Sequence, residues 1–165
     1  MAPQKNNNSP LTKEQKLERK QQLKDNCVKI LEQRINTINQ AIKEAQEAAN
    51  GEEKSSAGDK YETSRAMGHL SQEMHSNQLE QAKQELAIIN TLNTETLHDK
   101  AGFGALVICK DLAFFIALGL GTTEVNGQKI VLLSPQAPIA NSLHHKKAGD
   151  SFVFNTKTTL ILDVF

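Results

Sequence analysis

Two acidic residues three positions apart, Asp59 and Glu62, are the side chains in this sequence best placed to hold a metal ion. Residues with this spacing share one face of a helix, so both carboxylates can approach a single Mg²⁺. Magnesium in proteins is commonly held by one or two carboxylates, with phosphate oxygens and waters completing its shell. A structural interpretation is also open: Asp59 can cap a helix, and Glu62 can complete a capping box. Capping and metal contact do not exclude each other.

The acidic pair lies in a short polar stretch, residues 50–62, which contains Gly51 and Gly58. Residues 44–62 hold six acidic residues against two lysines, whereas residues 1–34 hold eight basic residues against four acidic ones. The formal net charge of the whole chain is zero, so only this distribution is informative. It can orient the molecule in the field of a partner, or it can simply solvate long helices.

The first helical segment precedes this stretch and covers residues 11–49, which contain neither Gly nor Pro. Its apolar residues alternate spacings of three and four, a pattern typical of a helix face packed against a partner helix. Asn50-Gly51 is expected to end the helix, and the small residues near its end should allow a partner helix to approach closely. The apolar residues of this face are Val28, Leu31, Ile35, Ile38, Ile42, Ala45 and Ala49.

A second helical segment is expected from about Asp59 to Leu92. Its apolar pattern slips between Met74 and Leu79, which predicts a local irregularity in the pairing. A short connection between two long helices predicts an antiparallel coiled-coil hairpin over residues 11–98, with its tip at 50–62. We expect a monomer, but the same apolar face can also pair two chains. The apolar residues of the second helix are Met67, Leu70, Met74, Leu79, Ala82, Leu86 and Ile89.

The composition changes after Ala101, where the phenylalanines and the β-branched runs of the chain occur. Short apolar runs separated by turns at Gly119, Gly121 and Asn126-Gly127 predict an antiparallel sheet. A short amphipathic helix is expected after Pro138, so residues 99–165 predict a compact α+β domain. The expected strands are 105–109, 112–118, 129–133, 151–154 and 160–164, and the expected core aromatic residues are Phe103, Phe114, Phe115, Phe152 and Phe154.

One segment of this domain resembles the signature of the Gre transcript-cleavage factors. That family has a Ser-Pro-x-x-Pro stretch, then Gly-Lys-x-x-Gly-Asp and a final strand, and it places a helical hairpin before this domain. The resemblance implies an FKBP-like fold for the sheet domain. The matching residues are Ser134, Pro135, Pro138, Lys146, Gly149 and Asp150, and His144-His145 stand near the family's Leu-Gly.

The resemblance also implies a partner, RNA polymerase, and an activity that belongs to this partner. The sheet domain would dock at the rim of the secondary channel, while the tip would reach the catalytic centre and promote cleavage of backtracked RNA. The protein would then be no enzyme and need no cofactor of its own, because Asp59 and Glu62 would share a Mg²⁺ of the polymerase. Gly58-Asp59-Lys60-Tyr61-Glu62 matches the family's Gly-Asp-x-x-Glu, but Thr63-Ser64-Arg65-Ala66 departs from the Asn-Ala-Glu-Tyr that follows it.

Several other residues are candidates for contact with the polymerase or with nascent RNA. Tyr61 can stack on a base or pack at the hairpin end, and Arg65 can contact nucleic acid or pair with Glu62. The basic residues at the start of the first helix can bind RNA or polymerase, or remain solvated. The remaining candidates are Glu52 and Glu53 in the tip and His144, Lys146 and Lys147 after the short helix, where a plain surface turn is the alternative.

Other functions remain open. Docking without cleavage would make the protein a channel-binding inhibitor or modulator. An FKBP-like isomerase or chaperone is a further alternative, but a proline pocket favours aromatic residues and the chain has no Trp.

The remaining features suggest a cytoplasmic protein. Cys27 and Cys109 lack metal-ligand spacing and are expected to be buried, unpaired thiols. Residues 1–10 are expected to form a disordered tail without signal-peptide character. No stretch of the sequence is long and apolar enough to predict a membrane span.

Overall fold

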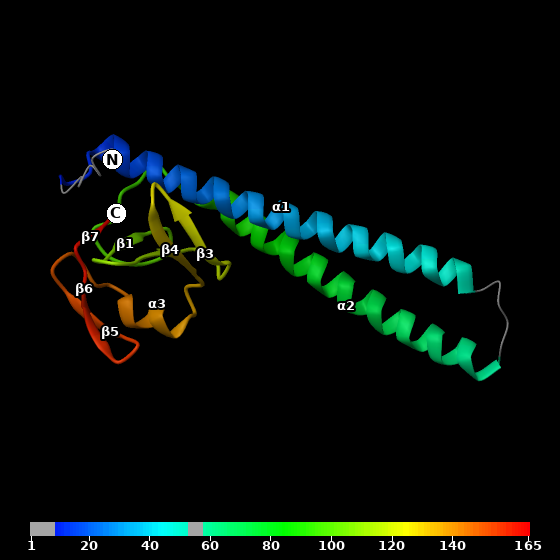
Figure 1. Ribbon diagram of the computed structural model, residues 1–165. Helices are drawn as coiled ribbons and strands as arrows, with labels where there is room; N and C mark the ends of the chain where they lie inside the picture. The colour runs from blue at the N-terminus through cyan, green and yellow to red at the C-terminus, as the bar shows by residue number, and fades with distance from the viewer. Residues whose placement is uncertain (1–8, 53–57) are drawn as a thin grey trace, which may run out of the picture. The chain divides into compact units, whose positions relative to one another are not determined.

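The computed structural model of the chain describes residues 9–52 and 58–165. They form two compact units: the described residues up to Asp25 join Leu92–Phe165 in the first, and Asn26–Thr91 forms the second. The expected α+β class is confirmed, because a pair of long helices is followed by a small, mainly antiparallel sheet and one short helix (Figure 1).

Helix α1 (Lys13–Glu52) begins with a reciprocal pair of hydrogen bonds. The backbone N–H of Gln15 donates to Thr12 Oγ1 at 3.2 Å, and the backbone N–H of Thr12 donates to Gln15 Oε1 at 2.9 Å. This capping box satisfies N–H groups that have no partner within the helix. The helix continues through Gly51 instead of ending before it, since a glycine in a last turn costs only about 1 kcal/mol relative to alanine.

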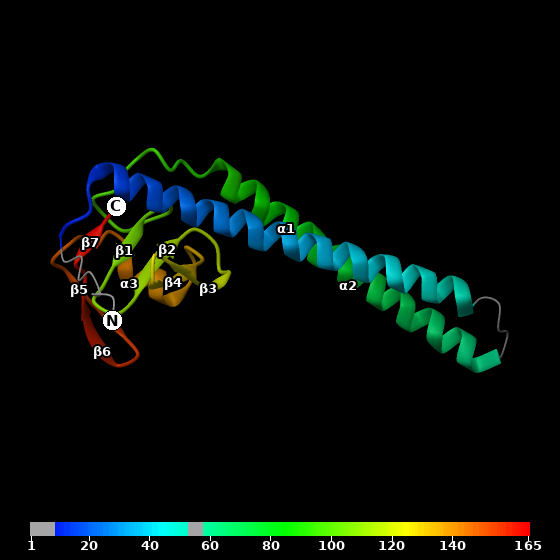
Figure 2. The ribbon, with the colours of Figure 1, turned by 45° about the horizontal axis from the view of Figure 1, so that its top comes forward.

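Helix α2 (Gly58–Thr91) runs beside α1 within the second unit, as the two ribbon views show (Figures 1 and 2). The expected three-four spacing is confirmed over residues 28–42 and 79–89. Leu31 and Ile38 of α1 are buried there, as are Ala82 and Ile89 of α2. The predicted antiparallel hairpin is therefore present, and its apolar face is satisfied within a single chain.

The irregularity expected in the helix pairing between Met74 and Leu79 is absent. Met67, Leu70 and Met74 are 62%, 61% and 51% exposed, so they lie on the outward face of the helix. The inward face keeps an unbroken alternation of four and three, and polar or small residues occupy it toward the tip, which is why apolar residues alone indicate the wrong face. The inward positions are Gly68, Gln72, His75, Leu79, Ala82, Leu86 and Ile89.

The sheet unit contains a five-stranded sheet in the order β3-β4-β2-β1-β7 and a separate pair, β5-β6. Neighbouring strands are antiparallel, except that β2 and β4 are parallel. The run 160–164, expected as one strand, is divided between β6 and β7. The elements are β1 Leu106–Ile108, β2 Ala113–Ile116, β3 Gly121–Val125, β4 Gln128–Leu133, α3 Pro138–Leu143, β5 Ser151–Phe154, β6 Lys157–Leu160 and β7 Asp163–Val164.

Edge strand β3 is absent from the sequence-based expectation, which places only turns in this region. Its residues Thr122 and Glu124 are exposed, so no apolar alternation marks it. Asn126 and Gly127 have positive φ values of 52° and 77°. Consecutive positive φ values are typical of the two-residue turn in a β-hairpin, so Asn-Gly was the signal for a strand on either side.

Side chains pack against both faces of the five-stranded sheet. On one face Phe114 packs with α3 and β5, and its ring meets Phe152 and Phe154 edge-on at centroid distances of 5.8 and 5.5 Å. On the other face Leu106 and Phe115, which are paired across β1 and β2, are fully buried. Burial on both faces explains why these strands read as continuous apolar runs.

The prediction that Phe103 belongs to the aromatic core is wrong. This residue lies in the loop before β1 and is 45% exposed, while Phe114, Phe115 and Phe152 are buried. Phe154 is partly buried and packs against the core. Phe103 stands between two glycines at the start of the sheet domain, and at this boundary its side chain lies outside the core.

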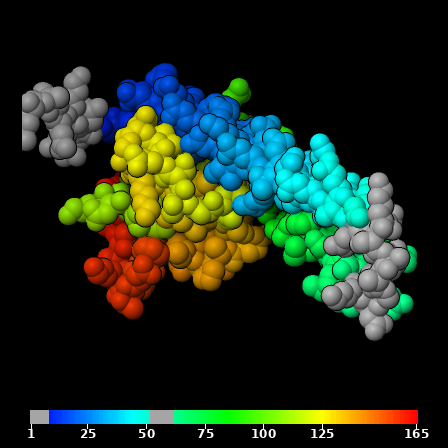
Figure 3. Space-filling view, turned by 45° about the vertical axis from the view of Figure 1, so that its right-hand side comes forward, coloured from blue at the N-terminus to red at the C-terminus, as the bar shows by residue number. Residues whose placement is uncertain are grey.

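Two basic residues at the start of α1 bind the sheet of the same unit. Lys16 Nζ lies 2.7 Å from Asp163 Oδ2 and 4.9 Å from the ring centroid of Phe165. Arg19 Nη1 donates to Gln128 Oε1 at 2.9 Å. The beginning of α1 (blue) accordingly lies against β3 and β4 (yellow) in the space-filling view (Figure 3).

Two further lysines of α1 bind the segment that follows α2. Lys20 Nζ donates to the carbonyl oxygen of Thr96 at 2.7 Å, and Lys24 Nζ donates to that of Leu92 at 2.8 Å. A lysine beside the end of a helix satisfies carbonyls that the helix leaves open. Lys20 is fully buried, so a solvated role is wrong for this residue.

Cys27 and Cys109 are buried and unpaired, as expected. Burial raises the pKa of each thiol to about 11. Within the part of the chain that the structure describes, no helix has the apolar length that a bilayer crossing requires.

Candidate functional site

The predicted tip acids belong to the first turns of α2. The helix begins at Gly58, so positions 59 and 62 are one helical turn apart on the same face. Glu62 is exposed to solvent. The side chains of Glu52, Asp59 and Tyr61, and the whole of Glu53, lie outside the described residues.

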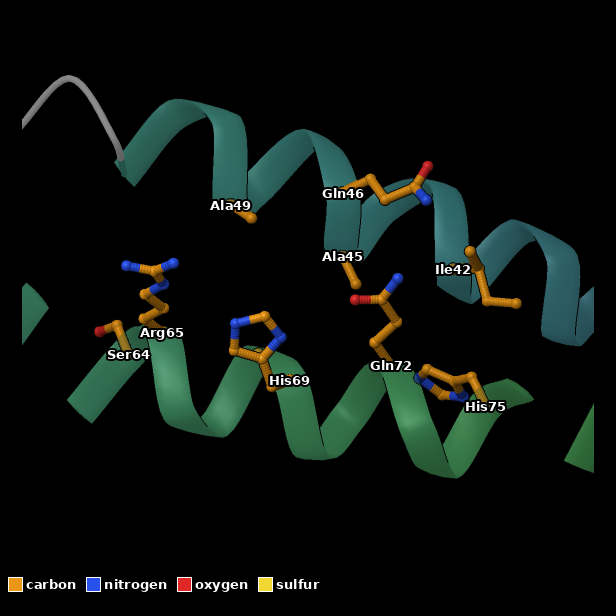
Figure 4. A pocket seen from close by; sticks show the side chains of 10 residues that line it. Ile42, Ala45, Gln46, Ala49, Ser64, Arg65, His69, Gln72 and His75 are labelled. Carbon is orange, nitrogen blue, oxygen red and sulfur yellow. The ribbon is translucent and has the colours of Figure 1, made fainter. Parts of the chain in front are cut away.

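Arg65 lies one turn further along α2 and does not pair with Glu62. The ion pairs among the described residues are Lys16–Asp163 and Arg34–Glu85. The side chain of Arg65 instead extends toward Ala49 on α1 (Figure 4). The expected ion pair is absent because Arg65 is on the side of α2 that faces α1.

A cavity of about 330 Å³ separates the two helices next to Arg65; we call it the distal cavity. Its α1 wall contains Ile42, Ala45 and Ala49. The close helix approach expected from these small residues is wrong, because α2 presents larger polar side chains opposite them. Those side chains are Arg65, His69, Gln72 and His75 (Figure 4).

The polar groups of the distal cavity are incompletely satisfied. Nδ1 of His75 is buried and has no hydrogen-bond partner among the described residues. Buried polar groups are nearly always hydrogen-bonded in proteins, so this nitrogen calls for a partner. His69 and His75 do not have the spacing of a metal site, and the sequence analysis did not bring them together. The signal was their place on the inward face of α2, which the exposed Met and Leu residues obscured.

The segment that carries the family-like motif forms a turn and a helix start. Ser134 Oγ accepts the backbone N–H of Gln136 at 3.2 Å, and the backbone N–H of Ala137 donates to Ser134 O at 3.0 Å. Pro138 stands at the first helical position of α3, where its fixed φ favours a helix and no N–H is lost. Ser134 and Pro138 therefore have local structural roles.

The four residues after α3, His144 to Lys147, form a corner rich in basic groups, which we call the basic corner. His144, His145 and Lys147 are exposed, and Lys146 is partly buried. The two histidine rings lie 3.8 Å apart between centroids. Four neighbouring basic side chains at a surface can bind an acidic partner surface.

Asp150 holds the turn that ends the basic corner. Its Oδ2 accepts the backbone N–H of Lys147 at 2.9 Å, and its backbone carbonyl accepts the N–H of Ile161 at 2.9 Å. Gly149 has a φ of 92°, a conformation that favours glycine. The Gly-Asp pair thus positions the backbone of Lys147.

An open groove of about 1430 Å³ lies elsewhere on the first unit. Both charge signs line it, including Arg19, Lys129 and Asp111, and no aromatic side chain of the described residues does. A site for an apolar ligand or a proline ring is usually lined by apolar and aromatic groups. This groove does not have that character.

Among the described residues, no group of three His, Cys, Asp or Glu side chains is arranged to hold a metal ion. Comparison with protein-family models, with curated proteins and with solved structures finds no match to this chain.

Proposed function

We propose that this protein is an RNA-polymerase-binding transcription elongation factor, which inserts the tip of its helical hairpin into the secondary channel and promotes cleavage of backtracked RNA. The observation that carries the proposal is a combination. A long, self-paired hairpin is joined to a sheet unit that contains the Gre-like Ser-Pro-x-x-Pro and Gly-Asp motifs, and an acidic stretch connects the two helices in the sequence.

The geometry of the hairpin supports delivery of a small group into a narrow space. Each helix advances about 1.5 Å per residue, so the 34 residues of α2 span roughly 50 Å. The pairing face is satisfied by buried residues such as Leu31 and Ile89. A hairpin of this kind can enter a channel without a second copy of the chain.

The tip offers carboxylates suited to Mg²⁺. Glu62 is exposed, and position 59 lies on the same helical face. Two carboxylates are as many as magnesium commonly takes from one protein. A second magnesium ion at a nuclease centre would steady the attacking water. Asp59 and Glu62 would complete the shell of an ion that the polymerase supplies.

The basic corner supports a docking role for the sheet unit. His144, Lys146 and Lys147 lie together at the surface and have no acidic ion-pair partner among the described residues. Asp150 holds the backbone of Lys147. The corner would bind an acidic surface of the polymerase.

Two alternatives share parts of this account. A channel-binding inhibitor or modulator would use the same docking and lack cleavage. An isomerase or chaperone would need an aromatic pocket, whereas Phe114, Phe152 and Phe154 pack on one another. The polymerase proposal is therefore favoured over the isomerase.

Binding to polymerase tests the proposal directly. Immobilised full-length protein should retain RNA polymerase from the source organism, and a Lys146→Ala/Lys147→Ala variant should retain at least several-fold less. A Lys110→Ala/Lys157→Ala variant loses the same charge from exposed positions of the same unit and should bind like the wild type. Failure of the wild-type protein to bind purified polymerase would contradict the proposal.

A further inference from the structure

The proposed function does not use the distal cavity. It lies between the last turns of α1 and the first half of α2 (Figure 4). Its volume of about 330 Å³ is at the lower end of the range for small-molecule pockets. Arg65, His69 and Gln72 are exposed, so the space is open to solvent.

Among the described side chains, the charged groups that line the cavity are basic. Arg65, His69 and His75 come from α2, and no carboxylate of the described side chains lines the space. Arg65 and His69 extend across it toward Ala45 and Ala49 (Figure 4). The guanidinium of Arg65 and the imidazole of His69, one helical turn away, offer donors that a phosphate or carboxylate group accepts.

The unpartnered nitrogen adds an independent observation. His75 Nδ1 is buried without a hydrogen-bond partner among the described residues. Gln72 lines the same space and offers amide donors and an acceptor. A bound polar group could satisfy this nitrogen without any movement of the helix backbone.

The opposite wall defines the rest of the ligand. Ile42, Ala45 and Ala49 present hydrocarbon to the space, and Gln46 is the polar residue that α1 adds to this wall. A ligand that fits both walls has a charged oxyanion at one end and a compact apolar or aromatic group at the other. Inorganic anions would leave the apolar wall uncovered.

We infer that the distal cavity is a binding site for a small organic oxyanion, a phosphate monoester or a carboxylate that carries an apolar group. Arg65 and His69, one turn apart on α2, hold the oxyanion, and the apolar group covers Ala45 in the direction of His75. The ligand joins α1 to α2 in the part of the hairpin that lacks large apolar contacts. Binding needs no polymerase, so the inference stands or falls separately from the proposed function.

The test is an NMR titration of the full-length protein, which follows the histidine side-chain signals. The probes are phenyl phosphate, benzoate and, as the uncharged control, benzyl alcohol. Phenyl phosphate or benzoate should shift the signals of His69 and His75 saturably, with no change at His98, which lies outside the cavity and the basic corner. The stronger of the two anions identifies the oxyanion class, and benzyl alcohol should produce no saturable shift.

Two variants separate a built site from a chance association. Arg65→Gln should weaken binding at least tenfold, because a charge-assisted contact is lost. Ala45→Leu should block binding while it leaves every charge in place. Lys83→Gln removes an exposed charge of α2 outside the cavity and should bind like the wild type. The absence of saturable shifts at millimolar concentrations would overturn the inference, and so would equal binding by the Arg65→Gln variant.

Discussion

The ammonium group of Lys20 donates a 2.7 Å hydrogen bond to the carbonyl oxygen of Thr96, and the lysine is fully buried. No carboxylate forms an ion pair with it among the described residues. Burial therefore lowers the pKa of Lys20 to about 8. Burial, and secondarily the charge of Lys20, also lowers the pKa of His98. The start of α1 is thus attached to the segment after α2 through a lysine whose charge is costly to bury.

This lysine predicts an unusual dependence of stability on pH. Its pKa is about 8 in the folded protein and near 10.5 when exposed, so the unfolded state binds more protons between these values. Stability contributed by this site should rise with pH through that window. Between pH 7.5 and 9 the unfolding free energy of the wild type should rise by about 1 kcal/mol relative to a Lys20→Met variant.

Urea denaturation of both proteins at the two pH values measures this difference. Comparing the proteins cancels the contributions of the two thiols, which act in the opposite direction. A difference in unfolding free energy that does not change with pH would contradict the buried, easily deprotonated Lys20.

The thiols of Cys27 and Cys109 should be protected in the folded protein. Burial raises both pKa values to about 11 from near 9, so at pH 8 almost no reactive thiolate is present. A thiol reagent at pH 8 should modify both cysteines quickly in urea and neither of them in the native protein. Rapid modification of either cysteine in the native protein would show that its surroundings open readily.

The register of the helical hairpin predicts opposite effects for two large-to-small changes in α2. Ile89 is fully buried, so Ile89→Ala should lower the unfolding free energy by about 2–5 kcal/mol. Leu70 is 61% exposed, so Leu70→Ala should change it by no more than about 0.5 kcal/mol. Chemical denaturation measures both values, and comparable losses would support the apolar face that the sequence suggests.

The hairpin also shows where sequence patterns succeed and where they fail. The pairing face is predictable where it is apolar, from Val28 to Ile42 and from Leu79 to Ile89. Toward the tip, Gly68, Gln72 and His75 occupy the inward positions. Met67 is apolar but exposed, so its residue type wrongly suggests a core position. Periodicity reports which face is apolar, and there the apolar face of α2 is the one that meets solvent.

The strands of the sheet unit are also only partly predictable from the sequence. The runs that became β1, β2 and β4 are predictable because both faces of the sheet are buried. β3 is polar and was missed, although the Asn126-Gly127 turn implies it. The distal cavity was not predictable, because its residues become neighbours only when two helices pair over a long sequence separation.

Asp150 should act through structure, although it matches the family motif. Its carboxylate accepts the backbone N–H of Lys147. Asp150→Ala should therefore lower the unfolding free energy by about 1 kcal/mol, because this bond is lost. Lys147→Ala keeps the backbone bond and should leave stability unchanged within about 0.5 kcal/mol. Equal stability of the Asp150→Ala variant and the wild type would contradict the role of this turn.

Cleavage of RNA in stalled, backtracked elongation complexes tests most directly the proposal that Asp59 and Glu62 act at the polymerase catalytic centre. Wild-type protein should shorten the 3′ end of the RNA in the presence of Mg²⁺. Asp59→Ala/Glu62→Ala should reduce this rate by about a hundredfold or more while still binding polymerase. Glu73→Ala/Glu80→Ala removes the same charge from the same helix and should cleave like the wild type. Undiminished cleavage with the Asp59→Ala/Glu62→Ala variant would contradict the claim, as would a wild-type protein that binds polymerase without shortening the RNA.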